Sequence, residues 1–220
     1  MIMTGLIANR HDVVICGHRL SGFLDVPENA AGLVIFAHGS GSGRHSPRNR
    51  HVAAGLNRVG MATLLVDLLT AEEERDRRNV FDVRLLAGRL REAAQWAEEV
   101  PQLGSLPIGY FGASTGAAAA LMAASMPGDR AAAIVSRGGR PDLAGAAALA
   151  RVTAPTLLIV GGLDHDVLGL NHDAKALMTA PSELAVVPGA SHLFEEPGTL
   201  DQVISLAARW FASHLKKEAR

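Results

Sequence analysis

The sequence has little cysteine, few aromatic residues and almost no net charge, and each shortage argues against a class of protein. Its 220 residues include one cysteine, Cys16, so no disulfide can form within the chain, as is typical of a reducing compartment. Aromatic residues make up 4%, which leaves little material for stacking nucleic-acid bases. The formal net charge of −1 gives no electrostatic reason to bind nucleic acid or an anionic membrane.

Long apolar runs are missing as well. No stretch approaches the length needed to span a bilayer, and the first residues lack the basic segment and apolar core of a signal peptide. These features predict a cytoplasmic protein with neither nucleic-acid nor membrane partners. The length and the even composition predict a single domain over residues 1–220, with 48% apolar residues to build its core.

The sequence does contain a regular alternation of apolar runs and segments with helical periodicity. Strands are predicted at residues 13–16, 20–26, 32–37, 62–66, 107–111, 132–135, 156–160 and 183–187. Helices are predicted at residues 48–59, 80–100, 114–125, 142–150, 173–178 and 200–216. The first two strands suit a hairpin, and strand and helix alternate after them. The pattern predicts an α/β fold with a mostly parallel sheet of about seven to eight strands and helices on both faces.

Two segments bear on access to a site in such a fold. The charged run at residues 71–78 (AEEERDRR) is interpreted as a solvated loop that enters a helix, and whether it closes over a site stays open. Residues 136–155 leave room for one short helix and for no large lid. This length favours a shallow pocket for small or short-chain substrates.

Chemically distinctive residues follow the predicted strands. Ligands of open α/β sheets bind beyond the carboxyl ends of the strands. A glycine-rich turn, 38–43 (HGSGSG), follows the strand at 32–37. Ser114, Asp164 and His192 follow three later strands, in that chain order.

This order, with Gly112 and Gly116 around the serine, matches the G-x-S-x-G elbow and the Ser…Asp…His triad order. Ser114 is the candidate nucleophile and His192 the base that takes its proton. Asp164 would orient and stabilise the imidazolium. Asp166 remains an alternative acid two residues further on, and Asp164 is favoured because it lies nearer the end of its strand.

On these residues the chain resembles the α/β-hydrolases, and more narrowly the dienelactone hydrolase family. The matching pieces are FAHGSGSGRHSPRN, LLVDLLTAEEE, GYFGASTG, LIVGGLDHDV and GASHLF, which together cover most of the chain. The first two are typical of a small bacterial subgroup of dienelactone hydrolase-like proteins, some of which are fused to a phosphoribosyltransferase domain. Family members proper use cysteine as nucleophile, whereas this chain has Ser114, and Cys16 lies on the predicted first strand. The difference favours a serine esterase.

The resemblance also implies a set of supporting residues. Backbone N–H groups of Ser40 and Thr115 would form the oxyanion hole after His38 and Gly39. Because these donors are backbone groups, the Thr115 side chain need not matter to them. His38 and Gly39 would also lie at the substrate. Because the family binds acidic lactones through arginines, Arg137 and Arg140 are candidates for a substrate carboxylate. No cofactor is implied.

Other interpretations stay open beside a serine hydrolase for small esters or lactones. The same triad could cleave thioesters or lactones or transfer acyl groups, and the fold could serve a non-catalytic small-molecule-binding protein. The HGSGSG turn lacks the full spacing of a dinucleotide fingerprint, and no histidine or cysteine spacing indicates a metal site. A monomer and a homodimer are both compatible with the sequence.

Overall fold

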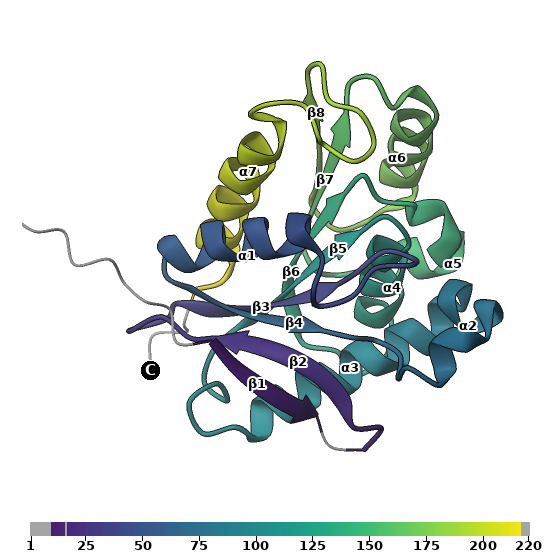
Figure 1. The fold of residues 1–220 in the computed structure, drawn as a ribbon. Helices are drawn as coiled ribbons and strands as arrows, with labels where there is room; N and C mark the ends of the chain where they lie inside the picture. The colour runs from purple at the N-terminus through teal and green to yellow at the C-terminus, as the bar shows by residue number, and fades with distance from the viewer. Residues whose placement is uncertain (1–9, 16, 217–220) are drawn as a thin grey trace, which may run out of the picture.

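Eight strands form one sheet in the order β1-β2-β4-β3-β5-β6-β7-β8 in the computed structural model, which describes residues 10–15 and 17–216 (Figure 1). Cys16 lies outside the described residues. The strands are β1 (Arg10–Ile15), β2 (Leu20–Asp25), β3 (Gly32–Ala37), β4 (Met61–Val66), β5 (Ile108–Ala113), β6 (Ala131–Arg137), β7 (Thr156–Gly161) and β8 (Ser182–Val187).

Whether two consecutive strands run parallel or antiparallel depends on the length of the segment that connects them. β1 and β2 form an antiparallel hairpin, and β2 is antiparallel to β4. All other neighbouring pairs are parallel, and every connection between consecutive strands from β3 onward contains a helix. Every residue of β3, β4, β5 and β7 is buried, which is the physical reason for their continuously apolar sequences. The predicted α/β-hydrolase fold is confirmed.

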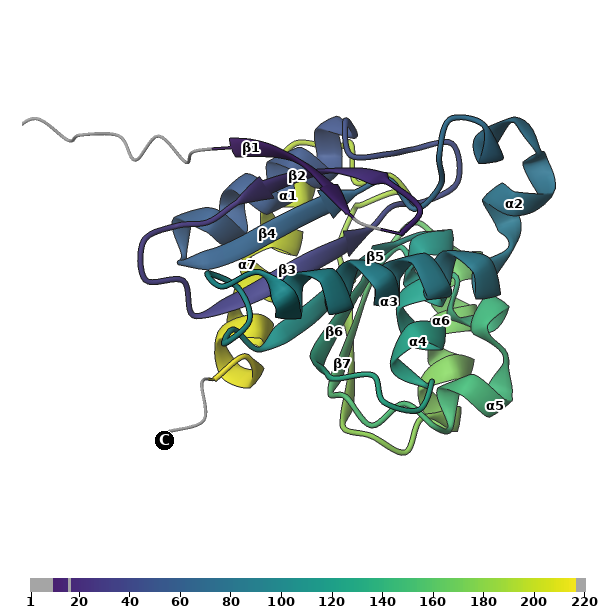
Figure 2. The same ribbon diagram turned by 90° about the horizontal axis from the view of Figure 1, so that it is seen from below.

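Helices cover both faces of the sheet (Figure 2). α1 (Pro47–Arg58) and α7 (Thr199–His214) pack on one face, where they share a core cluster around Phe111. The other face carries α3 (Val83–Glu99), α4 (Thr115–Ala124), α5 (Ala146–Leu149) and α6 (His165–Leu177). Parallel strands end on the same side of a sheet. One edge therefore carries the carboxyl ends of β3, β5, β6, β7 and β8.

Two predicted helices are divided in the structure. The segment predicted at 80–100 forms α2 (Arg77–Phe81) and then α3, because the Asp82 side chain accepts a hydrogen bond from Leu85 N at 3.0 Å and caps a new helix. The segment predicted at 142–150 is a 3₁₀ turn, η2 (Pro141–Ala144), followed by α5, with Gly145 at a φ of 81° between them.

The helix predicted at residues 173–178 is wrong in its start, because α6 begins at His165. The buried positions of α6 are spaced by four and three residues and form one helical face; they are Val167, Asn171 and Ala174. One of these positions is an asparagine, so the apolar period is interrupted. The Asn171 side-chain NH₂ donates to Gly139 O at 2.9 Å and to Val167 O at 2.8 Å, while its buried Oδ1 has no partner among the described residues.

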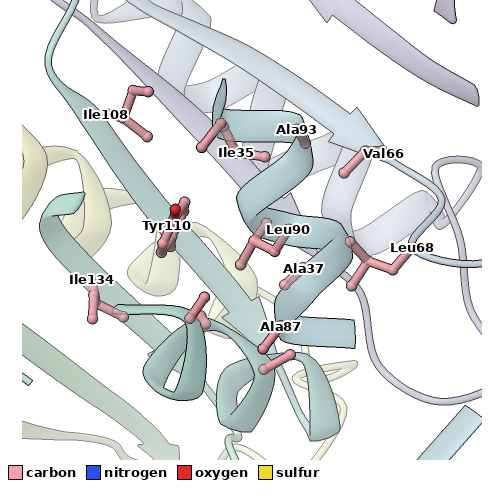
Figure 3. Close-up of a cluster of buried hydrophobic side chains, with 14 of the residues drawn as sticks. Ile35, Ala37, Val66, Leu68, Ala87, Leu90, Ala93, Ile108, Tyr110 and Ile134 are labelled. Carbon is pink, nitrogen blue, oxygen red and sulfur yellow. The ribbon is translucent and has the colours of Figure 1, made fainter. Parts of the chain in front are cut away.

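β5 is held by a well-packed core around Tyr110 (Figure 3). Figure 3 shows Tyr110 among apolar side chains from neighbouring strands and from α3, including Ile35, Leu90 and Ile134. The Tyr110 hydroxyl donates to Asp129 at 2.9 Å, so its one polar atom is satisfied. Burial raises the pKa of Tyr110 well above its ordinary value and keeps it neutral. The strand β5, which ends directly before Ser114, is therefore firmly positioned.

The connection from β6 to β7 contains only η2 and α5, so no large lid covers the carboxyl edge there. The charged run at 71–78 enters η1 (Glu73–Arg75) and then α2. None of the helices in the described part of the chain combines the length and apolar character needed to cross a membrane.

Candidate active site

Ser114 occupies a strained turn between β5 and α4. Its φ of 51° and ψ of −121° lie in a region that residues other than glycine rarely adopt. Hydrogen bonds on both sides hold the backbone there, from Ser114 N to Arg137 O at 3.2 Å and from Arg140 N to Ser114 O at 3.1 Å. The side chain does not cap the helix, so its hydroxyl is available for chemistry. Backbone strain of this kind clusters at functional sites.

Two glycines make this turn sterically possible. A Cβ atom on Gly116 would overlap the carbonyl oxygen of Ala37 and lie 2.5 Å from that of His38. A Cβ atom on Gly112 would lie 2.7 Å from the backbone nitrogen of Ala117. These neighbours are backbone atoms that cannot rotate away, so the G-x-S-x-G pattern is a packing requirement of the turn.

Gly116→Ala is therefore expected to lower the free energy of unfolding by about 3 kcal/mol, because the added methyl group must displace β3 or α4. Urea denaturation followed by circular dichroism measures the change. Gly88→Ala is the matched control, since nothing lies within 4 Å of a Cβ at that position in α3. This control should raise stability by about 0.5–1 kcal/mol. Equal effects of the two substitutions would contradict the packing argument.

His192 and Asp164 lie on loops that follow the neighbouring strands β8 and β7. Leu163 N donates to Ala190 O at 3.0 Å and joins the two loops. His192 Nδ1 lies 2.7 Å from Asp164 Oδ2. This contact places the ring proton on Nδ1 and leaves Nε2 free to accept another. Asp166 lies exposed in the first turn of α6 and does not bond to His192.

The segment at residues 137–140, which ends β6 and follows it, lies next to both Ser114 and His192. It binds the Ser114 backbone on one side. On the other side, a Cβ on Gly138 would lie 3.5 Å from His192 Nδ1. Ser114, Asp164 and His192 therefore gather at one edge of the sheet. The Ser114 hydroxyl forms no hydrogen bond with any residue in the described ranges.

The two predicted oxyanion donors also lie at the elbow, in an arrangement the sequence did not predict. Ser40 N donates to the hydroxyl oxygen of Thr115 at 2.8 Å, so that oxygen fills the acceptor position of the Ser40 N–H. Thr115 begins α4, where its own backbone N–H has no acceptor within the helix. Gly39 allows the loop to approach, because a Cβ there would lie 3.2 Å from Ser114 Cβ.

The structure assigns His38 to the scaffold. Its Nε2 accepts a hydrogen bond from Leu68 N at 3.1 Å, and its Nδ1 lies 3.0 Å from Gly39 O. The ring is buried, and both nitrogens are used in joining the ends of β3 and β4. This leaves His38 no ring nitrogen with which to bind a substrate, whereas Gly39 does lie against Ser114.

Arg137 and Arg140 have opposite environments. Arg140 binds Asp142 through two hydrogen bonds of 2.8 and 2.7 Å, and this partner raises its pKa. Arg137 is only 7% exposed and forms no hydrogen bond with any described residue. Burial, with the charge of Arg48 nearby, lowers the pKa of Arg137 to about 10. Its guanidinium lies 5.8 Å from the centre of the Phe194 ring.

A cavity of about 780 Å³ lies beside the loop that carries Ser40. Residues 41–47 form one wall, and Arg19 and Ser21 lie on another. The charged run contributes Ala71 and Glu74, so part of it borders this cavity. No single sequence motif predicts this hollow, because its polar walls come from three separate segments.

Across residues 10–15 and 17–216, no three His, Cys, Asp or Glu side chains converge in a way that could hold a metal ion. His172 and Asp173 lie 3.8 Å apart, and both are exposed on α6.

Known proteins resemble this chain in sequence and in fold. A dienelactone hydrolase from Anabaena variabilis is 50% identical, with a TM-score of 0.89 over 94% of this chain and 99% of that one. Est1E from Butyrivibrio proteoclasticus is 16% identical, with a TM-score of 0.78 over 93% of this chain and 98% of its own, and shows the shared fold. No protein-family model matches the chain.

A curated relative from Mycobacterium tuberculosis is 61% identical over 196 residues and carries the provisional name phosphoribosyl transferase. The match covers 89% of this chain but 44% of that protein. The chain therefore spans less than half the length of the curated relatives it matches.

Proposed function

We propose that this chain, which belongs to the dienelactone hydrolase-like family of α/β-hydrolases, is a serine hydrolase that cleaves small carboxylic esters or lactones. The observation that carries the proposal is the convergence of a strained serine with a bonded histidine–aspartate pair at one sheet edge. Hydrolase-fold relatives support the general chemistry. The ester bond as target is the specific part of the proposal.

In the proposed reaction, Ser114 Oγ attacks the ester carbonyl carbon while its proton passes to His192 Nε2. The carbonyl electron pair moves to oxygen and then returns, which expels the alcohol with the proton from His192. The Nδ1 proton stays on His192 throughout and is donated in a hydrogen bond to Asp164. Water, activated by His192, then attacks the acyl-enzyme and releases the acid and free Ser114.

The provisional name of the mycobacterial relatives describes a protein more than twice the matched length. We assign the hydrolase chemistry to the part that matches this chain and the phosphoribosyl transfer to the remainder. Purified chain should then leave phosphoribosyl pyrophosphate intact while it hydrolyses acetyl or butyryl 4-nitrophenyl esters. Consumption of the pyrophosphate compound by this chain would overturn the assignment.

A covalent probe tests the nucleophile directly. A fluorophosphonate should label the folded protein at the peptide that contains Ser114, as mass spectrometry of a digest would locate. Labelling with ester turnover supports the hydrolase. A folded protein without labelling and without turnover would favour a non-catalytic binding protein. Labelling together with turnover of thioesters but not of esters would show that the enzyme cleaves thioesters instead.

Arg137 supports a preference for acidic substrates. A largely buried cation without an anionic partner is costly, because no opposite charge compensates its own. The nearby cation Arg48 is paired with the exposed Glu195 at 2.9 Å, so no acid of this cluster neutralises Arg137. A carboxylate on the substrate would supply the missing anion. Arg140 is already paired and is not part of this proposal.

Arg137→Met is expected to reduce the preference for monomethyl succinate over methyl butyrate by about 10-fold, as befits a lost charged hydrogen bond. The same change should leave the protein as stable or about 1–4 kcal/mol more stable, since an uncompensated charge leaves the interior. Relative kcat/KM values and urea denaturation measure the two effects.

The pH dependence has a definite sign. Because the pKa of Arg137 is about 10, the preference should be constant below that pH and fall as pH rises through 10. Arg140→Met is the matched control and should keep the preference. An unchanged preference in Arg137→Met would exclude the carboxylate role, and a large loss of stability would instead mark a structural arginine.

A further inference from the structure

The hydroxyl of Thr115 occupies an unexpected place in the candidate oxyanion hole. Thr115 is the residue after the nucleophile and is 6% exposed. Its Oγ1 accepts the hydrogen bond from Ser40 N at 2.8 Å, although the residues are 75 positions apart in sequence. Oγ1 therefore lies where a substrate oxygen would have to lie in order to accept directly from Ser40 N–H.

The surrounding contacts hold this arrangement in place. The backbone of the Ser40 loop lies against the elbow, since a Cβ on Gly39 would be 3.1 Å from Ala113 O. Two residues further along the loop, Ser42 N donates to Gly39 O at 3.2 Å. Releasing Ser40 N–H would need rotation of a buried, β-branched side chain, which is stiff about χ1. Direct donation from Ser40 would thus first require Thr115 to move.

The bonding capacity of the hydroxyl suggests a different role. A threonine hydroxyl has one proton to donate and two lone pairs to accept with. At Thr115 one lone pair receives the Ser40 N–H, while the proton has no acceptor among the residues the structure describes. Buried donors are rarely left without a partner, so this one calls for an acceptor from outside the chain.

We propose that the Thr115 hydroxyl is itself an oxyanion donor, polarised by the Ser40 N–H behind it. This inference rests on the proposed function. As Ser114 Oγ forms its bond to the carbonyl carbon, the electron pair moving onto the carbonyl oxygen is met by Thr115 O–H and Thr115 N–H. Ser40 acts through Thr115 and does not touch the substrate oxygen. Its N–H donates to the Thr115 hydroxyl, which makes that hydroxyl a stronger donor. The backbone-only hole implied by the family resemblance is replaced by a relay through a side chain.

Three substitutions of Thr115 test the relay. Thr115→Val has nearly the same shape and lacks the hydroxyl, and it should lower kcat about 100-fold with little change in KM, as for loss of one oxyanion donor. Thr115→Ser keeps the hydroxyl and should stay within a few-fold of wild type. Thr115→Ala removes the hydroxyl and opens space, and it should be as impaired as the valine variant.

The alanine variant separates the relay from the alternative. If Thr115 only blocks Ser40 N–H and must rotate away, removing its side chain would free that donor. Thr115→Ala would then equal or exceed wild type, and that outcome overturns the proposal. Wild-type activity in Thr115→Val overturns it too.

A second readout does not depend on turnover. A trifluoromethyl ketone forms a hemiketal with the serine, and its oxygen mimics the oxyanion. The valine and alanine variants should bind it about 100-fold more weakly than wild type and the serine variant. Equal binding by all four proteins would contradict the relay.

Controls distinguish failure of the relay from failure of the proposed function. Thr156→Val removes a buried threonine hydroxyl that donates to Ala154 O at the opposite edge of the sheet, and it should not alter kcat. If Ser114→Ala keeps full ester turnover, the proposed function itself fails. If Ser114→Ala is inactive while Thr115→Val is fully active, only the relay fails.

Discussion

Ser114→Ala is expected to lower kcat for 4-nitrophenyl butyrate by at least about 10⁴-fold, because loss of a triad nucleophile removes the acyl-enzyme route altogether. The fold should survive, since the Ser114 backbone is held by two loop hydrogen bonds and its side chain makes no cap. A residual rate above that of water is expected, because the oxyanion donors and the binding site remain. Stopped-flow and steady-state assays with matched circular dichroism measure the change.

Ser125→Ala is the control for this substitution. Ser125 lies just past the other end of α4, where its hydroxyl donates to Met122 O at 2.8 Å. Its loss should cost about 1 kcal/mol of stability and leave kcat unchanged. Equal activities of Ser114→Ala and wild type would mean that a different nucleophile, or no covalent step, accounts for turnover.

Sequence patterns predicted the sheet closely because burial on both faces leaves a simple signature. β3 has the predicted bounds, and both of its ends are set by polar or glycine-containing turns. The rule that sites form at the carboxyl ends of parallel strands predicts that the serine, the acid and the histidine share one edge. These positions are fixed by backbone topology, which apolar runs encode well.

The helices were less predictable because their burial is partial. α6 buries an asparagine in the middle of its core-facing side, so its apolar period is interrupted. The sequence pattern therefore does not predict its first two turns as helix. The predicted 80–100 helix divides because one side chain, that of Asp82, caps the second part. A local capping bond can change a boundary without changing the hydrophobic pattern.

The roles of individual side chains in the site were the hardest to predict, since they depend on which neighbouring group each side chain binds. Arg137 and Arg140 lie in the same short sequence, SRGGRPDL. Asp142 captures Arg140, whereas Arg137 ends a buried strand and lacks an acid. The contact between Thr115 and Ser40 joins residues far apart in sequence and depends on one rotamer. No local pattern contains that information.

Asp164→Asn is expected to lower kcat by about 10³–10⁴-fold with little change in KM. An amide nitrogen at this position can donate to His192 Nδ1, which moves the ring proton to Nε2. The histidine then cannot take the proton of Ser114. Fluorophosphonate labelling should slow by a similar factor, because it depends on the same proton transfer.

Asp166→Asn is the matched control two residues away, and its kcat should stay within about two-fold of wild type, as expected of an exposed helical carboxylate. The reverse result, with Asp166 essential and Asp164 dispensable, would assign the triad acid to the other aspartate. Loss of activity in both variants would indicate a general need for negative charge near His192.

The Asp164 variant is also a clean test of mechanism on structural grounds. Asp164 is the N-cap residue of α6, yet its side chain makes no capping hydrogen bond with the helix. Asparagine is as good an N-cap as aspartate, so the substitution should leave α6 intact. The carboxylate is therefore committed to His192 instead of to the helix it precedes. A kinetic loss without a loss of stability would then identify the Asp164–His192 contact as part of the chemistry, and a parallel loss of both would identify it as part of the fold.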